Sequence, residues 1–339
     1  MHPSKFLAGA SLALLSMLPL LTSADAAAQQ PIVIKFSHVV ATDTPKGKAA
    51  EYFKKLAEER AKGRVKVELY PNSQLYKDKE EMEALQLGAV QMLAPSLAKF
   101  GPLGVRDFEV FDLPYIFDNY EQLHKVTQGA VGAGLLKKLE SKGIVGLAYW
   151  DNGFKQMSAN KPLRKPDDLR GLKMRIQSSK VLDAQMRALG AAPQVMAFSE
   201  VYQALQTGVV DGTENPVSNL YTQKMHEVQK FLTLSDHGYL GYAVIVNRKF
   251  WEGLPADLRT TLEGAMKDAT KYGNEIAKKE NDDALEAVKK SGRTQIIALT
   301  PQEKAEWKKA LIKVHRQSED RIPKELIRTI YAETGFKPD

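Results

Sequence analysis

The chain has no cysteine among its 339 residues. It can therefore form no disulfide bond, and it offers no thiol as a nucleophile, a metal ligand or an attachment point for a lipid. Its histidines are scattered without the spacing typical of a metal site. We therefore expect no metal ion and no other cofactor. Of the six histidines, His2 lies near the N-terminus, and the other five are His38, His124, His226, His237 and His315.

Enzyme motifs are also missing. The sequence has no G-x-S-x-G elbow, no H-E-x-x-H pair and no P-loop. A glycine-rich stretch over residues 129–134 lacks the G-x-G-x-x-G spacing of nucleotide sites, and the pattern places it between two helices rather than after a strand. We expect a protein that is not an enzyme. Scattered Asp and Glu side chains could still converge in space, so a hydrolase or an isomerase is the alternative.

Only the N-terminus carries a long apolar run. Lys5 precedes an apolar stretch over residues 6–21, and Ala24-Asp25-Ala26 has the small-x-small pattern of a signal peptidase site. A membrane helix is the other interpretation, but the run is short and is broken by serines and a proline. The pattern predicts a signal peptide over residues 1–26 and export, most simply to a bacterial periplasm.

The charge is positive, with a formal net value of +7. Lysines alternate with acids along predicted helices, as in residues 51–60, and no basic run contains interleaved aromatics. This pattern is typical of a solvated helix face. We therefore expect no nucleic-acid partner, and the charge favours solubility and attraction of anions.

Apolar and amphipathic segments alternate in a way that indicates an α/β fold with parallel sheets. Roughly 310 residues remain after the signal peptide, enough for two lobes with separate cores. The last long helical segment exceeds an ordinary globular helix, so it either bends or braces two lobes. Predicted strands cover residues 32–37, 65–70, 88–92, 144–150, 172–176 and 240–246, and predicted helices cover 45–61, 78–87, 180–189 and 255–291.

One internal similarity supports two lobes. Residues 83–90 (EALQLGAV) resemble residues 203–210 (QALQTGVV). Each segment predicts a helix that ends at glycine and a strand that begins at once. Chance similarity is the alternative. If the repeat is real, both lobes use equivalent loops at strand ends, where open α/β sheets bind ligands.

A candidate anion site lies within residues 171–216. Arg175 stands near the end of a predicted strand, and Ser178 and Ser179 can cap the helix that follows. A guanidinium fork beside the N-terminus of a helix suits a carboxylate. Asn215 closes another strand end. The segment predicts a site for a small carboxylate.

Five motifs connect the sequence to a known family. It resembles the solute-binding proteins of tripartite ATP-independent periplasmic (TRAP) transporters, and within them the dicarboxylate-binding (DctP) branch. The resemblance covers essentially the whole mature chain. The motifs are AFSEVYQALQTGVVDGTENP at 197–216, KMRIQSS at 173–179, KFSHVV at 35–40, PNSQL at 71–75 and FDLPYIF at 111–117.

This resemblance implies a monomeric, type II-like periplasmic binding protein with two α/β lobes. Parallel or mixed sheets, hinge strands and a long bracing helix would connect them, and the lobes would close over the ligand. The expected lobe I is residues 29–152 plus 241–280, and the expected lobe II is residues 153–240 plus 281–339. The partners it implies are a small organic acid and the membrane permease subunits of a TRAP transporter, driven by an ion gradient rather than by ATP.

The resemblance also assigns site residues. Arg175 matches the arginine that holds a substrate carboxylate, Asn215 the asparagine beside it, and Phe198 an aromatic wall. Lys155 and His38 replace an arginine and an asparagine of sialate-binding members. With Pro95 in place of a glutamate, these departures argue against sialic acid and for a short dianion. Further lining candidates are Ser96, Trp150, Asn152 and Tyr239.

Structural roles are the alternatives for several of these residues. Lys155 could be solvated, His38 and Phe198 could belong to a core, and Arg175 could form a structural ion pair. We expect a receptor for malate, succinate or fumarate. A keto acid, an aromatic acid or a sugar acid is the alternative ligand, because one or two uncharged groups decide between such acids.

Overall fold

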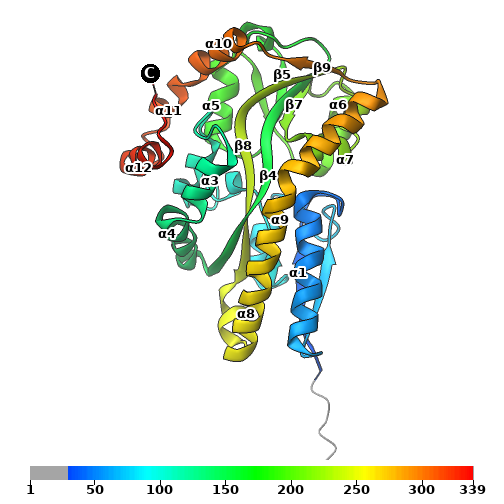
Figure 1. Cartoon of the computed structure of the whole chain (residues 1–339), viewed down its shortest axis with the longest axis vertical. Helices are drawn as coiled ribbons and strands as arrows, with labels where there is room; N and C mark the ends of the chain where they lie inside the picture. The colour runs from blue at the N-terminus through cyan, green and yellow to red at the C-terminus, as the bar shows by residue number, and fades with distance from the viewer. Residues whose placement is uncertain (1–29, 339) are drawn as a thin grey trace, which may run out of the picture. The chain divides into compact units, whose positions relative to one another are not determined.

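The computed structural model describes residues 30–338, and the predicted signal peptide lies outside the described residues. Strands and helices alternate along the chain (Figure 1). The strands are β1 (Ile32–Ser37), β2 (Val65–Tyr70), β3 (Met92–Leu93), β4 (Ile144–Ala159), β5 (Lys173–Ile176), β6 (Ala192–Val195), β7 (Gly212–Asn215), β8 (Phe231–Asn247) and β9 (Gln295–Ala298). The α-helices are α1 (Pro45–Ala61), α2 (Glu81–Gln86), α3 (Tyr120–Thr127), α4 (Ala130–Lys138), α5 (Lys180–Ala188), α6 (Val201–Gln206), α7 (Val217–Thr222), α8 (Arg248–Gly253), α9 (Ala256–Ser291), α10 (Pro301–Leu311), α11 (Lys313–Gln317) and α12 (Lys324–Thr334).

A single mixed sheet runs through the fold in the order β2-β1-β3-β8-β4-β7-β5-β6, with β9 added to β8. At one end, β1 pairs in parallel with β2 and β3, and at the other end β5 pairs in parallel with β6 and β7. We call the half built on β1–β3 lobe I and the half built on β5–β7 lobe II. The antiparallel strands β4 and β8 lie between them, side by side along the sheet (Figure 1). This arrangement confirms the predicted α/β class with a mixed sheet and hinge strands.

The two connecting strands are longer than predicted. The predictions of 144–150 and 240–246 were wrong in length, because β4 has 16 residues and β8 has 17. Polar residues interrupt the apolar pattern beyond these limits, but the structure pairs their side chains. Gln156, for example, donates a hydrogen bond of 2.7 Å to the Asp236 carboxylate on the neighbouring strand. With such groups paired, the ladder can continue through a polar stretch.

The register of β4 on β8 shifts between Asp151 and Gly153, opposite Leu240 and Gly241. A shift of this kind disrupts the ladder and bends the strand locally. It lies at the predicted division of the chain at residues 152–153 and 240–241. The division itself stays a prediction, and the irregular register makes this position a natural hinge.

Helix α9 is a single helix of 36 residues, in agreement with the prediction of one long helix. It lies along α1 and β4 and also contacts α7, so it braces lobe I against lobe II (Figure 1). Small residues permit the close approach to α1, since a Cβ added at Gly273 would lie only 2.8 Å from the Cβ of Ala49. Among residues 30–338, no helix has both the length and the apolar character needed to cross a bilayer.

The internal similarity extends to the structure. Helices α2 and α6 each have six residues, and each is followed by a glycine with positive φ, 79° at Gly88 and 73° at Gly208. The strands begin four residues later, at Met92 and Gly212, and not at once as predicted. Helix α2 also begins at Glu81 instead of residue 78. The three intervening residues form a turn that the apolar pattern concealed.

Candidate functional site: a cavity between the two lobes

A small cavity, of about 20 Å³, lies where loops from both lobes meet the connecting strand β8. Lobe I contributes the turn after β1, the segment before α2 and the segment after β3. Lobe II contributes the ends of β5 and β7, the start of α6 and helix α7. We call this space the inner cavity. Its lining residues are Val39, Val40, Asp78, Ser96, Lys99, Gln177, Phe198, Asn215, Asn219, Leu240 and Tyr242.

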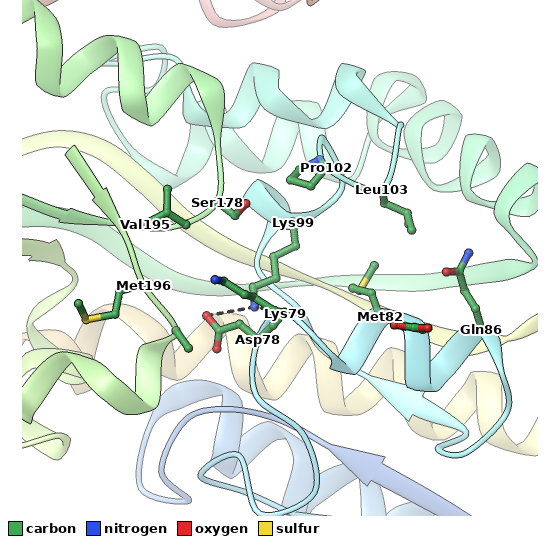
Figure 2. Close-up of a pocket in the computed structure, with 12 residues that line it drawn as sticks. Asp78, Lys79, Met82, Gln86, Lys99, Pro102, Leu103, Ser178, Val195 and Met196 are labelled. Carbon is green, nitrogen blue, oxygen red and sulfur yellow. Dashed lines mark hydrogen bonds and ion pairs between the residues drawn. The ribbon is translucent and has the colours of Figure 1, made fainter.

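The lobe I side of the inner cavity carries an ion pair. The ammonium of Lys99 lies 3.1 Å from Oδ2 of Asp78 and also donates to the Asp78 carbonyl at 2.8 Å (Figure 2). Glu81 adds a second carboxylate, 3.5 Å from the same ammonium. All three side chains are buried. Lys99 is therefore a fixed, desolvated cation at the edge of the cavity.

The pKa values of the two carboxylates shift in opposite directions. Burial alone would raise the pKa of Asp78, but the charges of Lys99 and Arg175 outweigh burial and lower that pKa below its ordinary value. Burial raises the pKa of Glu81, since Lys99 only partly opposes it and the charge of Asp78 adds to the rise. Neither carboxylate oxygen of Glu81 has a hydrogen-bond partner within the described residues.

A further buried cation stands behind the cavity. The ammonium of Lys46, at the start of α1, donates to the Ala94 carbonyl at 2.9 Å and lies 3.7 Å from the centre of the Tyr242 ring. Burial lowers the pKa of Lys46 to about 7, with Glu81 opposing the shift and Lys99 adding to it. Lobe I thus places two buried amino groups, Lys46 and Lys99, beside the carboxyl groups of Asp78 and Glu81.

Arg175 approaches from lobe II. Its Nε and Nη2 groups donate to the Met196 carbonyl at 3.1 and 2.8 Å, and Nη2 lies 3.9 Å from Oδ2 of Asp78. The guanidinium carbon lies 5.7 Å from the centre of the Phe198 ring, which itself lines the cavity. The guanidinium stands directly behind the cavity wall, with further N–H groups beyond those that Met196 engages.

Neutral hydrogen-bonding groups complete the lobe II side. Gln177 donates to the Ser96 hydroxyl at 2.8 Å and so connects the lobes. Asn152, on β4, donates to Oδ1 of Asn219 at 2.9 Å and to the Tyr242 hydroxyl at 2.8 Å. These bonds fix the orientation of two lining side chains. Side-chain hydrogen bonds therefore connect several of the groups that line the cavity.

Sequence-predicted residues fall into three groups. Asn215, Phe198 and Ser96 line the inner cavity. Arg175 lies against its wall, and Asn152 supports two lining residues. The others lie elsewhere in the fold and do not line this cavity: Lys155, His38, Trp150 and Tyr239.

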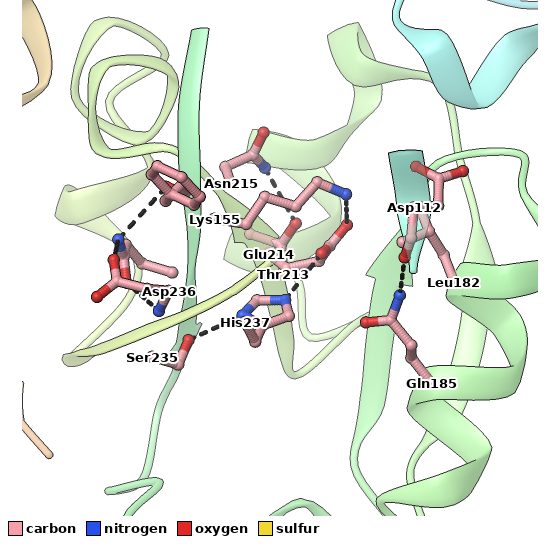
Figure 3. Close-up of polar contacts among 12 residues, drawn as sticks. Asp112, Lys155, Leu182, Gln185, Thr213, Glu214, Asn215, Ser235, Asp236 and His237 are labelled. Carbon is pink, nitrogen blue, oxygen red and sulfur yellow. Dashed lines mark hydrogen bonds and ion pairs between the residues drawn. The ribbon is translucent and has the colours of Figure 1, made fainter. Parts of the chain in front are cut away.

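Lys155 is only 1% exposed, so the alternative of a solvated lysine is wrong. Its ammonium lies 2.9 Å from Oε1 of Glu214, and His237 bonds the other oxygen of that carboxylate at 3.0 Å (Figure 3). Burial would raise the pKa of Glu214, but Lys155 and His237 lower it. Because Glu214 precedes Asn215 on β7, this network supports the strand end that carries a lining residue. Lys155 is not among the residues that line the inner cavity, and its predicted contact with ligand stays a prediction.

His38 is buried behind the turn after β1, and burial together with the charge of Lys46 lowers its pKa to about 3. The imidazole does not line the inner cavity. Trp150 belongs to the lobe I core and donates to the Thr270 hydroxyl at 2.9 Å. Tyr239 donates to Asp151 at 2.6 Å inside another core. None of the three side chains lines the inner cavity, and their predicted contacts with ligand stay predictions.

Sequence reasoning missed Lys99 and Asp78, the charged residues of the cavity, and also Gln177, Asn219 and Tyr242. The internal repeat held a signal for Asp78, which lies 120 residues before the predicted Phe198, the same offset that relates the two similar segments. Lys99 lies 120 residues before Asn219, which was missed as well. Groups of at least three His, Asp or Glu side chains suited to a metal ion do not occur in the part of the chain that the structure describes.

The fold and the cavity together define a two-lobed binding protein whose ligand cavity lies between the lobes. Comparison with known sequences identifies the family. Residues 36–321 match the bacterial extracellular solute-binding proteins of family 7, DctP, and the chain belongs to this family. The resemblance seen in the sequence is thereby confirmed.

Individual relatives are also similar over most of their length. The C4-dicarboxylate-binding periplasmic protein DctP of Rhodobacter capsulatus is 70% identical over 306 residues, which are 90% of this chain and 92% of the relative. A TRAP periplasmic solute-binding protein of Shewanella oneidensis, solved with bound succinate, is 43% identical with a TM-score of 0.88, covering 90% of this chain and 99% of the other. One from Pseudomonas aeruginosa, solved with bound L-malate, is 45% identical with a TM-score of 0.83, covering 85% and 100%.

Proposed function

We propose that this protein is a periplasmic receptor that binds a C4-dicarboxylate such as succinate, malate or fumarate and delivers it to the permease of a TRAP transporter. The observation that carries the proposal is the inner cavity. It is small, it lies between two lobes, and it has a fixed cation on each side, Lys99 from lobe I and Arg175 from lobe II.

The charges around the cavity suit a dianion. Arg175 and Lys99 bring two positive charges, while Asp78 brings one negative charge and the pKa of Glu81 is raised toward the neutral form. Lys46 adds positive charge below its pKa of about 7. A doubly charged ligand would neutralise cations that are otherwise costly to bury. One carboxylate would take N–H groups of Arg175 and Asn215, and the other would take Lys99.

Micromolar affinity requires roughly 8 kcal/mol. Charge-assisted hydrogen bonds contribute about 1.5–3 kcal/mol each, so two anchored carboxylates with several donors are a sufficient source. The proposal receives further support from relatives that share more than two fifths of the sequence and were solved with succinate or malate. The role proposed for the protein is binding and release of an unchanged ligand, with no chemical step.

The experiment is calorimetry of the purified protein with succinate, L-malate, fumarate and butyrate, supported by thermal unfolding. A ligand at 100 times its dissociation constant should raise the free energy of unfolding by about 2.7 kcal/mol. We expect at least one diacid to bind at least tenfold tighter than butyrate, and NMR should recover it unchanged. Equal affinity for butyrate and succinate would contradict the dicarboxylate assignment. Chemical conversion of the ligand would contradict the receptor role.

A further inference from the structure

The inner cavity has a neighbour. A second space, of about 260 Å³, lies between α2 and the segment after η1 (Leu97–Lys99) on one side and the ends of β5 and β6 on the other. We call it the outer groove. Figure 2 shows its lining side chains. They are Asp78, Lys79, Met82, Glu83, Gln86, Lys99, Pro102, Leu103, Ser178, Val195, Met196 and Ala197.

Two residues line both spaces, namely Asp78 and Lys99. Adjacent residues of lobe II face the two spaces separately, since Gln177 lines the inner cavity and Ser178 the outer groove. Likewise, Phe198 lines the inner cavity and Ala197 lines the outer groove. The inner cavity and the outer groove therefore lie back to back, and the ion pair of Asp78 with Lys99 is part of the partition between them.

We propose that the Asp78–Lys99 ion pair is the wall that limits the ligand to about four carbons, and that removal of the Asp78 side chain joins the inner cavity to the outer groove. This inference rests on the proposed function. It concerns the length of the ligand, which the charge of the site alone does not determine.

Hydrogen bonds and an ion pair hold the side chains of Asp78 and Lys99 in place. Oδ2 of Asp78 accepts a hydrogen bond of 3.3 Å from the backbone N–H of Phe198, across the two lobes. Lys99 is held by the carboxylate of Asp78 at 3.1 Å and by its carbonyl at 2.8 Å. Both side chains are less than 9% exposed. The pair is a packed partition rather than a mobile surface contact.

The outer groove suits the middle of a longer diacid. Met82, Leu103, Val195 and Met196 give it apolar walls that methylene groups can contact. Lys79 is an exposed cation that also lines the groove and could meet a distant carboxylate. With the wall removed, a straight-chain diacid anchored at Arg175 could extend from the inner cavity into the groove.

The test measures dissociation constants for succinate, glutarate, adipate and suberate by calorimetry, with wild-type protein and Asp78→Ala. We expect adipate to bind the wild type at least 100-fold more weakly than succinate. In Asp78→Ala this ratio should fall at least tenfold. Asp78→Asn is the matched control, because it removes the charge but keeps the volume, and its ratio should stay within threefold of wild type.

A second variant fills the groove. Val195 is 49% exposed at the end of β6, so Val195→Trp can place a large ring in the groove without disturbing a core. Added to Asp78→Ala, it should restore the wild-type discrimination. Alone it should leave succinate binding unchanged.

Several outcomes would contradict the proposal that the Asp78–Lys99 pair limits the length of the ligand. One is a wild-type protein that binds adipate within tenfold of succinate, a result that requires no variant to fold. Another is a ratio in Asp78→Ala equal to that in Asp78→Asn. In both cases succinate would still bind, so the proposed function would stand. A wild-type protein without affinity for any diacid would overturn the proposed function and this inference together.

Discussion

The two similar segments of the chain place different chemistry at equivalent positions. Residues 78–99 of lobe I and residues 198–219 of lobe II share a short helix, a left-handed glycine and a strand that ends at the cavity. In lobe I the equivalent lining positions hold Asp78 and Lys99, and in lobe II they hold Phe198 and Asn219. The same backbone thus provides a charged wall on one side and a neutral wall on the other.

This difference shows how a repeated backbone can place different side chains on the two sides of one cavity. The backbone of Phe198 donates to Asp78, so the two equivalent positions contact each other across the cavity. Lobe II supplies its cation from β5 instead, through Arg175. Lys99 of lobe I and Arg175 of lobe II therefore come from positions that the repeat does not relate. Replacements in each segment test whether this division of roles holds.

The largest effect is expected at Arg175. Arg175→Ala should weaken succinate binding by about 3–5 kcal/mol, because the ligand carboxylate loses its buried partner. Arg175→Lys should also bind much more weakly, since a point charge cannot replace a planar fork. Calorimetry measures both. Arg187→Ala is the control, since Arg187 is exposed on α5 and pairs with Asp183. Near-native affinity in either Arg175 variant would assign that arginine a structural role.

The next largest effect is on the pH dependence of the free energy of unfolding, which two buried groups, Asp112 and His38, change in opposite directions. Burial raises the pKa of Asp112, which packs against α5 of lobe II, to about 7. The folded protein then keeps a proton that the unfolded chain releases near pH 4, so the free energy of unfolding falls as pH rises from about 4 to 7. Asp112→Asn should remove about 2–4 kcal/mol of this fall, as measured by denaturant unfolding.

His38 in lobe I should act the other way. Its pKa of about 3 lies below the ordinary value, so the free energy of unfolding falls as pH decreases from 6.5 toward 3. His38→Gln should remove about 2 kcal/mol of that loss at pH 5. Identical pH profiles for wild type and either variant would show that the corresponding group titrates alike in the folded and unfolded protein.

A smaller effect on ligand affinity should distinguish the equivalent residues Lys99 and Asn219. Lys99→Met should cost about 1.5–3 kcal/mol of succinate binding, because a charge-assisted bond to the distal carboxylate is lost, and should leave butyrate binding nearly unchanged. Asn219→Ala should cost about 1 kcal/mol with both acids, since it removes a neutral donor. Calorimetry with the two acids gives the four values. An equal loss of butyrate binding in Lys99→Met would place the monocarboxylate, and not the distal carboxylate, at Lys99.

Much of the fold could be predicted because local patterns decide it. Strand β1 and helix α1 follow the apolar periodicity and the Thr44 cap, whose hydroxyl accepts from the Gly47 N–H at 3.1 Å. Strands β4 and β8 were predicted too short because their polar residues are paired only after the chain has folded. Arg175, Asn215 and Phe198 were found because each lies in a recognisable motif. Lys99 was missed because it lies in no recognised motif, and a single lysine in a sequence is usually a surface residue.

The sequence by itself determined the α/β class, the length of the bracing helix and the family, because these depend on periodicity, caps and motifs that neighbours along the chain specify. Only the tertiary structure decided which charges meet. In the folded protein Lys155 pairs with Glu214, and Lys99 lies near two carboxylates at the cavity. Burial also lowers the pKa of His38. Electrostatic roles depend on distance and desolvation, and both arise only when segments far apart in the sequence pack together.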